Sequence, residues 1–324
     1  MIDILLGAAD LSLICFARSP LEEAIQSLSV PSDARRSAMH RPWLAAAGSR
    51  ISGLDLDLLR ALVCQPNVLP DFLCPPPTRM DTQFHEELAY VRASTAEQVR
   101  AGIDDVRGTK PVPPVLNALY DAPERHLGRL VDQIDDYWQA AIEPVWPRLS
   151  ALLEADLAYR ARCLTTGGLA GLFADLHPEI EYRGDSVRIH KPHHSYQRPA
   201  SDTGMLLVPC VFGWPRLTVL YTEDVARPAL GYPARGVADV WSVARDTQGA
   251  PLADLMGRTR SQVLASLDLP MSTTHIAALL GMTTPTASHH LSVLRRCNLV
   301  SSQRSGREVL YQRTPLGSSL LDSA

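Results

Sequence analysis

Long apolar runs are missing from this sequence of 324 residues. A transmembrane helix needs about 18 or more consecutive apolar residues, and no such run occurs, so the sequence predicts no transmembrane segment. The N-terminus, MIDILLGAADLSLICFA, is apolar, but Asp3 and Asp10 interrupt it and no basic segment precedes it. We therefore expect it to be folded structure rather than a signal peptide.

Paired cysteines are also missing. The six cysteines stand at positions 15, 64, 74, 163, 210 and 297, and no two of them form a CxxC pair. A chain of this length can bury a sizeable core and does not need disulfides, so a reducing cytoplasm is the simplest setting. We expect a cytoplasmic protein.

The common catalytic motifs are absent as well. The sequence contains no nucleophile elbow, phosphate loop or dinucleotide fingerprint. The segment TTGGLAGLF at 165–173 has glycines without a strand-loop-helix context, which indicates a break in a helix. Tyr232 and Arg235, in YPARGVADVW, are as well suited to holding a turn as to binding a ligand. We predict that the protein is not an enzyme, with no catalytic residue and no cofactor.

The composition indicates a soluble globular protein of about two domains, because 46% of the residues are hydrophobic and 20% are charged. Residues 251–324 hold seven Lys or Arg and four Asp or Glu, a net charge of +3. Residues 1–250 hold 24 and 31, a net charge of −7. A basic tail on an acidic body fits a small DNA-binding module attached to a regulatory domain, although ordinary fluctuation gives similar values.

The first 250 residues predict an α+β domain that is mostly helical to about residue 175. Ser19 is a predicted N-cap before Pro20, and one apolar stripe with helical spacing covers 124–142. Residues 178–242 are β-rich and predict a small antiparallel sheet, with a hairpin that turns at Gly184–Asp185.

Residues 251–324 predict a winged helix-turn-helix, built from short elements in a fixed order. SQVLASL is an amphipathic helix, and STTHIAALLG is a second helix that stops at Gly281. After a tight turn, Thr284 is the predicted N-cap of a third helix and Pro285 its first residue. The glycine allows the second and third helices to cross closely.

The third predicted helix has an apolar face and a polar face. Ala287, Leu291 and Leu294 share a narrow arc, while the opposite face offers hydroxyl, imidazole and guanidinium groups for bases and phosphates in a major groove. The adjacent His289 and His290 diverge by about 100°, which argues against a shared metal. Cys297 lies toward the apolar side, and we expect it to be buried.

The segment LVSSQRSGREVLYQRT predicts two strands around a turn at Ser305–Gly306, a basic hairpin beside the helix-turn-helix. Such a wing contacts the phosphate backbone or the minor groove. The residues that we predict to contact DNA are Thr284, Thr286, Ser288, His289, Ser292, Arg295, Arg296, Arg304, Arg307 and Tyr311.

The stretch from about 255 to 320, and TASHHLSVLRRCNLV with its basic hairpin above all, resembles the winged helix of ArsR/SmtB-type bacterial transcriptional repressors. The resemblance implies a homodimer that places two recognition helices in successive major grooves of an operator and releases it on an inducing signal. The whole chain also resembles actinobacterial regulators of this type that carry a large N-terminal domain of unknown function.

Two familiar metal sites of that family are missing. Metal-sensing members carry paired cysteines before the recognition helix, where this chain has PMSTTHIAALLG with His275 alone. Others bind zinc on a long C-terminal helix, where this chain has PLGSSLLDSA. Because that helix also forms the usual dimer contact, the N-terminal domain is an alternative place for dimerisation. We predict no bound metal.

The leading hypothesis is a sequence-specific DNA-binding regulator, a dimeric repressor released from an inverted-repeat operator by a small-molecule effector sensed within 1–250. One alternative is a small-molecule-binding or catalytic N-terminal domain with the winged helix as an interaction module. Another is a metal sensor that uses the His190–His194 loop, HKPHH, with Cys210 nearby.

Overall fold

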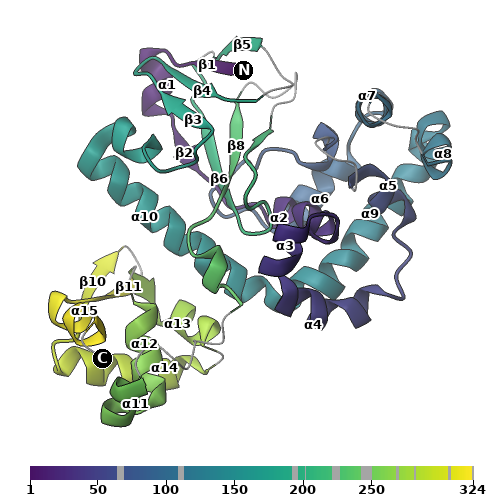
Figure 1. The fold of residues 1–324 in the computed structure, drawn as a ribbon. Coiled ribbons are helices and arrows are strands. Elements are labelled where there is room, and N and C mark those ends of the chain that lie inside the picture. The colour runs from purple at the N-terminus through teal and green to yellow at the C-terminus, as the bar shows by residue number, and fades with distance from the viewer. Residues whose placement is uncertain are drawn as a thin grey trace. The chain divides into compact units, whose positions relative to one another are not determined.

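The computed structural model describes residues 1–63, 69–108, 113–191, 196–200, 202–220, 227–241, 250–267, 270–280, 282–305 and 308–322 (Figure 1). The chain divides into two compact units, and each unit is discontinuous in sequence. The first unit contains Met1–Trp146 and Cys163–Ala234, and the second contains Pro147–Arg162 and Arg235–Ala324. The predicted domain boundary near residue 250 adjoins 242–249, outside the described residues.

Helices make up most of the first unit, as the sequence predicts for residues 1–175. They are α1 (Ala8–Ser12), α2 (Pro20–Leu28), α3 (Ala34–Met39), α4 (Arg41–Ile51), α5 (Asp57–Val63), α6 (Phe84–Arg92), α7 (Ala96–Arg107), α8 (Val115–Asp121), α9 (Pro123–Tyr137) and α10 (Trp146–Phe173), the last of them shared with the second unit. In the part of the chain that the structure describes, no helix is long and apolar enough to cross a bilayer.

Local sequence explains where these helices begin. The Ser19 hydroxyl accepts a hydrogen bond from Glu22 N at 2.9 Å, and Pro20 stands in the first turn, as predicted for α2. The apolar stripe of α9 is buried through Leu130 and Ile134. It continues into a π-helical segment at Trp138–Ile142, where the Trp138 ring stacks on Phe84 with centroids 4.2 Å apart.

One four-stranded sheet has the order β3-β4-β1-β5. Its strands are β1 (Ile2–Leu5), β3 (Ile180–Tyr182), β4 (Ser186–Ile189) and β5 (Tyr196–Pro199). The predicted hairpin is confirmed, since β3 and β4 pair antiparallel around Gly184, whose φ of 90° suits glycine. β1 pairs antiparallel with β4 and parallel with β5. The N-terminal segment is therefore a central strand of this sheet.

The second sheet of this unit has the order β2-β6-β8-β7. Its strands are β2 (Cys15–Phe16), β6 (Leu206–Cys210), β7 (Thr218–Leu220) and β8 (Ala229–Pro233). β2, β6 and β8 run parallel, and β7 is antiparallel to β8. The α+β class is confirmed, but both sheets are mixed rather than antiparallel, since β1 pairs parallel with β5 and β6 pairs parallel with β8. β1 and β2 come from an N-terminal segment in which no strand was predicted.

A single apolar cluster holds the two sheets and the end of α10 together. It contains Ile4 of β1, Val187 of β4, Leu207 of β6 and Leu230 of β8, with Phe173 from the last turn of α10. Each of these side chains is nearly inaccessible to water. Burial of this apolar area is the dominant stabilising contribution to the unit.

A buried polar junction joins the helices to the end of β6. The Glu23 carboxyl accepts hydrogen bonds from Val211 N at 2.6 Å and Phe212 N at 2.9 Å. Arg36 donates to the Phe212 carbonyl at 2.6 Å and to the Gln26 carbonyl at 2.6 Å. These bonds pair backbone N–H and C=O groups that follow β6 in the protein interior. A buried backbone group without a hydrogen-bond partner would destabilise the fold.

Burial changes the protonation of this junction and its neighbours. Desolvation raises the pKa of Glu23 to about 7 and that of Glu87 to about 8, against the opposing effect of their hydrogen bonds. Desolvation lowers the pKa of His40 to about 4, and the nearby Arg36 adds to this. The interior of the helical part thus favours neutral carboxyl and imidazole groups.

We expect the free energy of unfolding to fall between pH 6.5 and 8.5. In this range the folded chain keeps protons on Glu87 and Glu23 that the unfolded chain has lost, so stability decreases as pH rises through the folded pKa values. His40 is neutral in the folded chain but still partly protonated in the unfolded chain near pH 6.5, which slightly offsets the decrease at the lower end of the range. Glu87→Gln should remove about 1–2 kcal/mol of the decrease.

Urea titrations of the full chain at several pH values measure this effect. The Arg183→Ala variant, which changes an exposed side chain of β3–β4, is the control and should keep the decrease. A midpoint that rises from pH 6.5 to 8.5, or an unaltered decrease in Glu87→Gln, would contradict the prediction.

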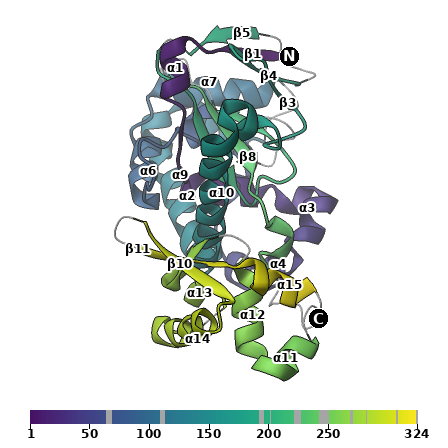
Figure 2. The same ribbon diagram turned by 90° about the vertical axis from the view of Figure 1, so that its left-hand side faces the viewer.

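The second unit is a small helical domain with a three-stranded sheet in the order β10-β11-β9. Besides residues 147–162 of α10, it contains α11 (Ala250–Met256), α12 (Arg258–Ser266), β9 (Met271–Ser272), α13 (Thr273–Leu279), α14 (Thr284–Arg296), β10 (Val300–Ser305), β11 (Glu308–Arg313) and α15 (Pro315–Asp322). Figure 2 shows the β10–β11 hairpin beside α13 and α14. This is the predicted winged helix-turn-helix.

Candidate DNA-binding interface

The turn between α13 and α14 is held by backbone hydrogen bonds. Leu280 N donates to the Ile276 carbonyl at 3.0 Å, and Met282 N donates to the Ala277 carbonyl at 2.9 Å. The predicted helix stop at Gly281 lies outside the described residues. These bonds end one helix and start the next within four residues, which is the geometry of a helix-turn-helix.

The start of α14 lies one residue earlier than predicted. The N-cap is Thr283, whose backbone is extended and whose hydroxyl accepts a hydrogen bond from Thr286 N at 3.4 Å. Thr284 is therefore the first helical residue and Pro285 the second. The error is understandable, because threonine occupies both 283 and 284, and proline is tolerated anywhere in the first turn, where its missing N–H has no partner to lose.

The apolar face of α14 forms part of the core of this unit. Ala287, Leu291 and Leu294 are at most 1% exposed. They pack in one cluster with Val263 and Leu264 of α12 and with other apolar residues of the unit. The predicted apolar arc is thus buried, and its burial fixes the rotation of α14 about its own axis.

The end of α14 corrects the prediction for Cys297. Asn298 has a left-handed φ of 58°, and Leu299 N donates to the Leu294 carbonyl at 3.0 Å, so the helix ends at Arg296. Cys297 is the C-cap, and it is exposed rather than buried. Extending the helical spacing to residue 297 fails because the helix has already ended there.

The polar face of α14 is exposed to solvent. The exposed residues of the predicted site on this helix are Thr284, Thr286, Ser288, His289, Ser292, Arg295 and Arg296. Hydroxyl, imidazole and guanidinium groups can donate or accept hydrogen bonds at base edges, and the guanidinium groups can also bind phosphates. A helix that presents such groups on its free face has the chemistry of a recognition helix.

The wing places a basic side chain on the same side as α14. Arg295 donates to the Ser302 hydroxyl of β10 at 3.4 Å. Because side chains alternate along a strand, Arg304 lies on the same face of β10 as Ser302, and it is exposed. Arg307 lies outside the described residues. Tyr311 of β11 is half-buried, with its ring against the core of the unit.

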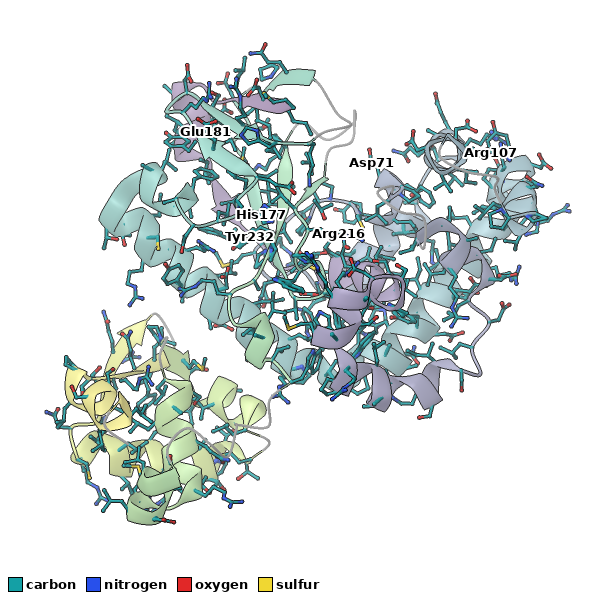
Figure 3. All side chains as sticks on the ribbon, in the orientation of Figure 1. Asp71, Arg107, His177, Glu181, Arg216 and Tyr232 are labelled. Atoms are coloured by element: carbon teal, nitrogen blue, oxygen red, sulfur yellow. The ribbon has the colours of Figure 1, made fainter. Side chains whose placement is uncertain are left out.

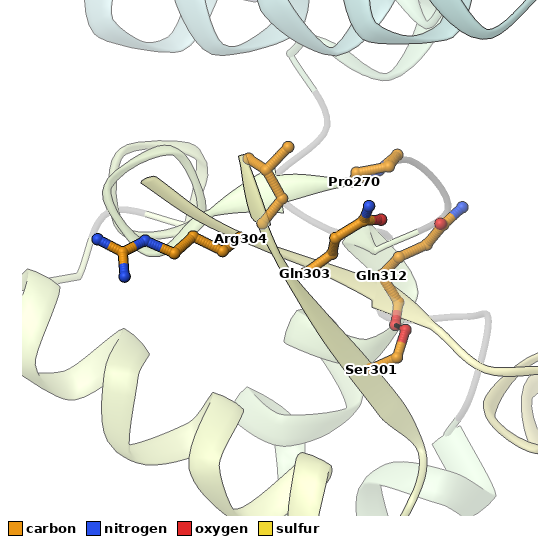
Figure 4. A pocket seen from close by; sticks show the side chains of 6 residues that line it. Pro270, Ser301, Gln303, Arg304 and Gln312 are labelled. Carbon is orange, nitrogen blue, oxygen red and sulfur yellow. Dashed lines mark hydrogen bonds between the residues drawn. The ribbon is translucent and has the colours of Figure 1, made fainter. Parts of the chain in front are cut away.

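The wing also has a shallow hollow of about 180 Å³. Ser301 and Gln303 of β10 line it opposite Gln312 and Leu310 of β11, with which they are paired in register, and Pro270 and Arg304 also line it. In Figure 4 the Arg304 side chain points away from Gln303 and Gln312. The guanidinium of Arg304 is thus directed away from the amide groups that share the hollow with it.

The histidines of α14 are not arranged around a common metal position. The rings of His289 and His290 lie edge to face with centroids 5.7 Å apart. Partial burial lowers the pKa of His290, and the nearby Arg260 of α12 lowers it further. A cationic neighbour disfavours metal binding, and no group of three metal-ligating side chains occurs among the residues that the structure describes.

Part of the predicted histidine loop lies within the described residues. His193 and His194 lie outside the described residues. The His190 ring is half exposed, 3.7 Å from the carboxylate of Glu181, which is labelled in Figure 3. His177 lies outside this loop and is also labelled in Figure 3. One of its ring nitrogens accepts a hydrogen bond from Glu179 N at 3.1 Å, so the other donates a hydrogen bond to the Pro215 carbonyl at 3.0 Å. Both nitrogens of His177 are thus used in structural contacts.

The second unit thus has a helix-turn-helix, an exposed polar face on the second helix of that motif, and a basic wing, which define a winged-helix DNA-binding fold. Residues 258–302 match the family described as bacterial regulatory protein, arsR family. Residues 105–238 match a family of unknown function, DUF5937. The resemblance to ArsR-type regulators that carry an N-terminal domain of unknown function is therefore confirmed over these two segments. Comparisons with curated proteins and with solved structures gave no match.

We expect the apolar and polar faces of α14 to respond differently to substitution. Leu291→Ala should lower the free energy of unfolding by about 2–5 kcal/mol, because it leaves a cavity in the core of the unit. The adjacent Ser292→Ala should change it by no more than about 0.5 kcal/mol, since Ser292 is exposed. Urea titration of both variants is the measurement, and equal losses would contradict the assignment of the two faces.

Proposed function

We propose that the protein is a dimeric transcriptional repressor that binds an inverted-repeat operator through α14 and the wing. The observation that carries this proposal is the hydrogen bond from Arg295 of α14 to Ser302 of β10, which joins the exposed face of α14 to the strand that carries Arg304. Two copies related by a twofold axis would place their recognition helices in successive major grooves, about 34 Å apart. The match to the arsR family supports the proposal.

The residues divide by the role that we propose for them. His289, Ser292 and Arg296, on the face of α14 opposite the core, contact base edges and provide specificity. Arg304 and Arg307 contact phosphates and provide affinity that does not depend on sequence. Thr284, Thr286, Ser288, Arg295 and Tyr311 complete the proposed interface. The N-terminal unit senses an effector and decides when the operator is released, and the protein acts in the cytoplasm.

A gel-shift titration with the DNA upstream of the protein's own gene tests this function. We expect binding at moderate salt that an unrelated duplex of the same length displaces poorly. Binding that is equally strong to both duplexes, or undetectable, would overturn the proposal.

The base-contacting residues should determine specificity. We expect His289→Ala and Arg296→Ala each to weaken operator binding by about 1–3 kcal/mol while changing binding to the unrelated duplex less, because a base contact is lost. Arg183→Ala, in the N-terminal unit, removes a charge without touching α14 and is the control. A loss of the same size on both duplexes would show that neither side chain distinguishes bases.

The wing should determine the salt dependence. Arg304→Ala should weaken binding to both duplexes alike and reduce the slope of log K against log salt by about 0.9, the value for one lost phosphate contact on B-DNA. The measurement is the same titration repeated at several salt concentrations, again with Arg183→Ala as the charge-matched control. An unchanged slope in Arg304→Ala would exclude this contact.

A further inference from the structure

The helix α10 is divided between the two compact units. Of its 28 residues, those from Pro147 to Arg162 cluster with the winged helix, and those from Cys163 onward cluster with the N-terminal unit. In Figure 1 it is the long teal helix that follows α9 in the chain. One continuous element thus has each of its two parts packed in a different unit.

Apolar contacts build the first part of α10 into the DNA-binding unit. Ala155 is 3% exposed and belongs to the same core cluster as Val263, Leu264 and Leu291. A Cβ added at Gly236 would lie 3.0 Å from Leu152, so the segment after β8 passes close to this part of the helix. The winged helix therefore shares its core with α10.

Polar contacts on the same face of α10 reinforce this packing. Asp156 is fully buried and accepts a hydrogen bond from Arg235 N at 3.0 Å. Arg160, one turn later and also buried, lies 3.8 Å from the Asp156 carboxylate. The Arg235 guanidinium lies 3.6 Å above the Tyr159 ring. The contacts of Arg235 join α10 to the segment after β8, whereas the pair of Asp156 and Arg160 lies within the helix and balances two buried charges.

A break separates this part of α10 from its last turns. Gly168 has φ 60° and ψ −157°, a conformation that is essentially restricted to glycine. A Cβ added at Gly168 would meet no atom within 4 Å, so the glycine is required by its backbone conformation and not by lack of space. The preceding Gly167 also lies in open space but does not have a positive φ.

We propose that residues 147–162 are a structural part of the DNA-binding unit, and that α10 is the element through which the N-terminal unit controls operator binding. Gly168 lies in the part of α10 that packs in the N-terminal unit, so its broken conformation sets the path of the helix end within that unit. A change in that unit reaches the core behind α14 through Ala155, while Asp156 and Tyr159 contact the segment after β8. This regulatory role rests on the proposed function, whereas the structural role does not.

Hydrogen exchange of the full-length protein tests the structural role without DNA. Asp156→Ala should increase exchange in α11, α12 and α14 by at least about tenfold and leave β1, β4 and β6 unchanged. Arg235→Ala removes one contact with Tyr159 from an exposed position and should cause a smaller increase, about two- to fivefold, without risk of unfolding the chain. Arg183→Ala is the control and should change none of these segments.

Two outcomes of this experiment overturn the structural role. One is unchanged exchange of α11, α12 and α14 in both Asp156→Ala and Arg235→Ala. The other is an increase spread equally over both units. If Asp156→Ala does not fold, Arg235→Ala decides the question alone.

Neighbouring glycine variants test the regulatory role. In gel shifts with the upstream DNA, Gly168→Ala should change operator affinity by at least about threefold, because alanine disfavours the broken conformation. Gly167→Ala should leave the affinity within about twofold, since helical geometry accepts alanine. Equal affinities of the two variants would overturn the role of the break. Absence of specific binding by the unaltered protein would instead overturn the proposed function, and the exchange experiment would still decide the structural role.

Discussion

The burial of Ala287, Leu291 and Leu294 is the constraint on which the DNA-binding unit depends. A helix has one rotation about its axis, so once this apolar arc lies in the core, the opposite face must lie in solvent. The hydrogen-bonded turn before α14 and the left-handed Asn298 after it fix where the helix starts and ends. The exposed polar face of α14 and its position beside the wing follow from these local constraints together.

The N-terminal unit is organised around a polar interior as well as an apolar one. Glu23 and Arg36 hold the backbone where β6 ends, and the ring of Phe212 lies 4.5 Å from Trp43 and 4.8 Å from His40. Such a junction orients helices that come early in the sequence against strands that come late. Its cost is that acids are buried, and burial raises the pKa of Glu23 and Glu87 until they are largely protonated in slightly acidic solution.

The limits of the two matched segments differ from the limits of the two compact units. The match to the family of unknown function covers residues 105–238, which include all of α10 and also Arg235. The match to the arsR family begins at residue 258. Part of what the first family describes is thus packed inside the winged-helix unit. A domain boundary placed between the matched segments would cut a shared core, which is a physical reason for the two to occur in one chain.

The sequence alone determined the features that depend on neighbours within about one helical turn. Ser19 and Pro20 predicted the start of α2, Gly184 the hairpin, and the spacing of Leu291 and Leu294 the two faces of α14. Each depends on a cap, a turn or a side-chain period, which are properties of a short segment.

Tertiary structure alone decided the contacts between distant segments. No local pattern pairs β1 with β4 and β5, or places Asp156 against Arg235 inside the DNA-binding unit. A strand pairs with whichever edge the fold presents, and a buried charge is stable only where the fold provides its partner. The recognition helix could therefore be found from its own residues, whereas the packing of half of α10 behind it could not.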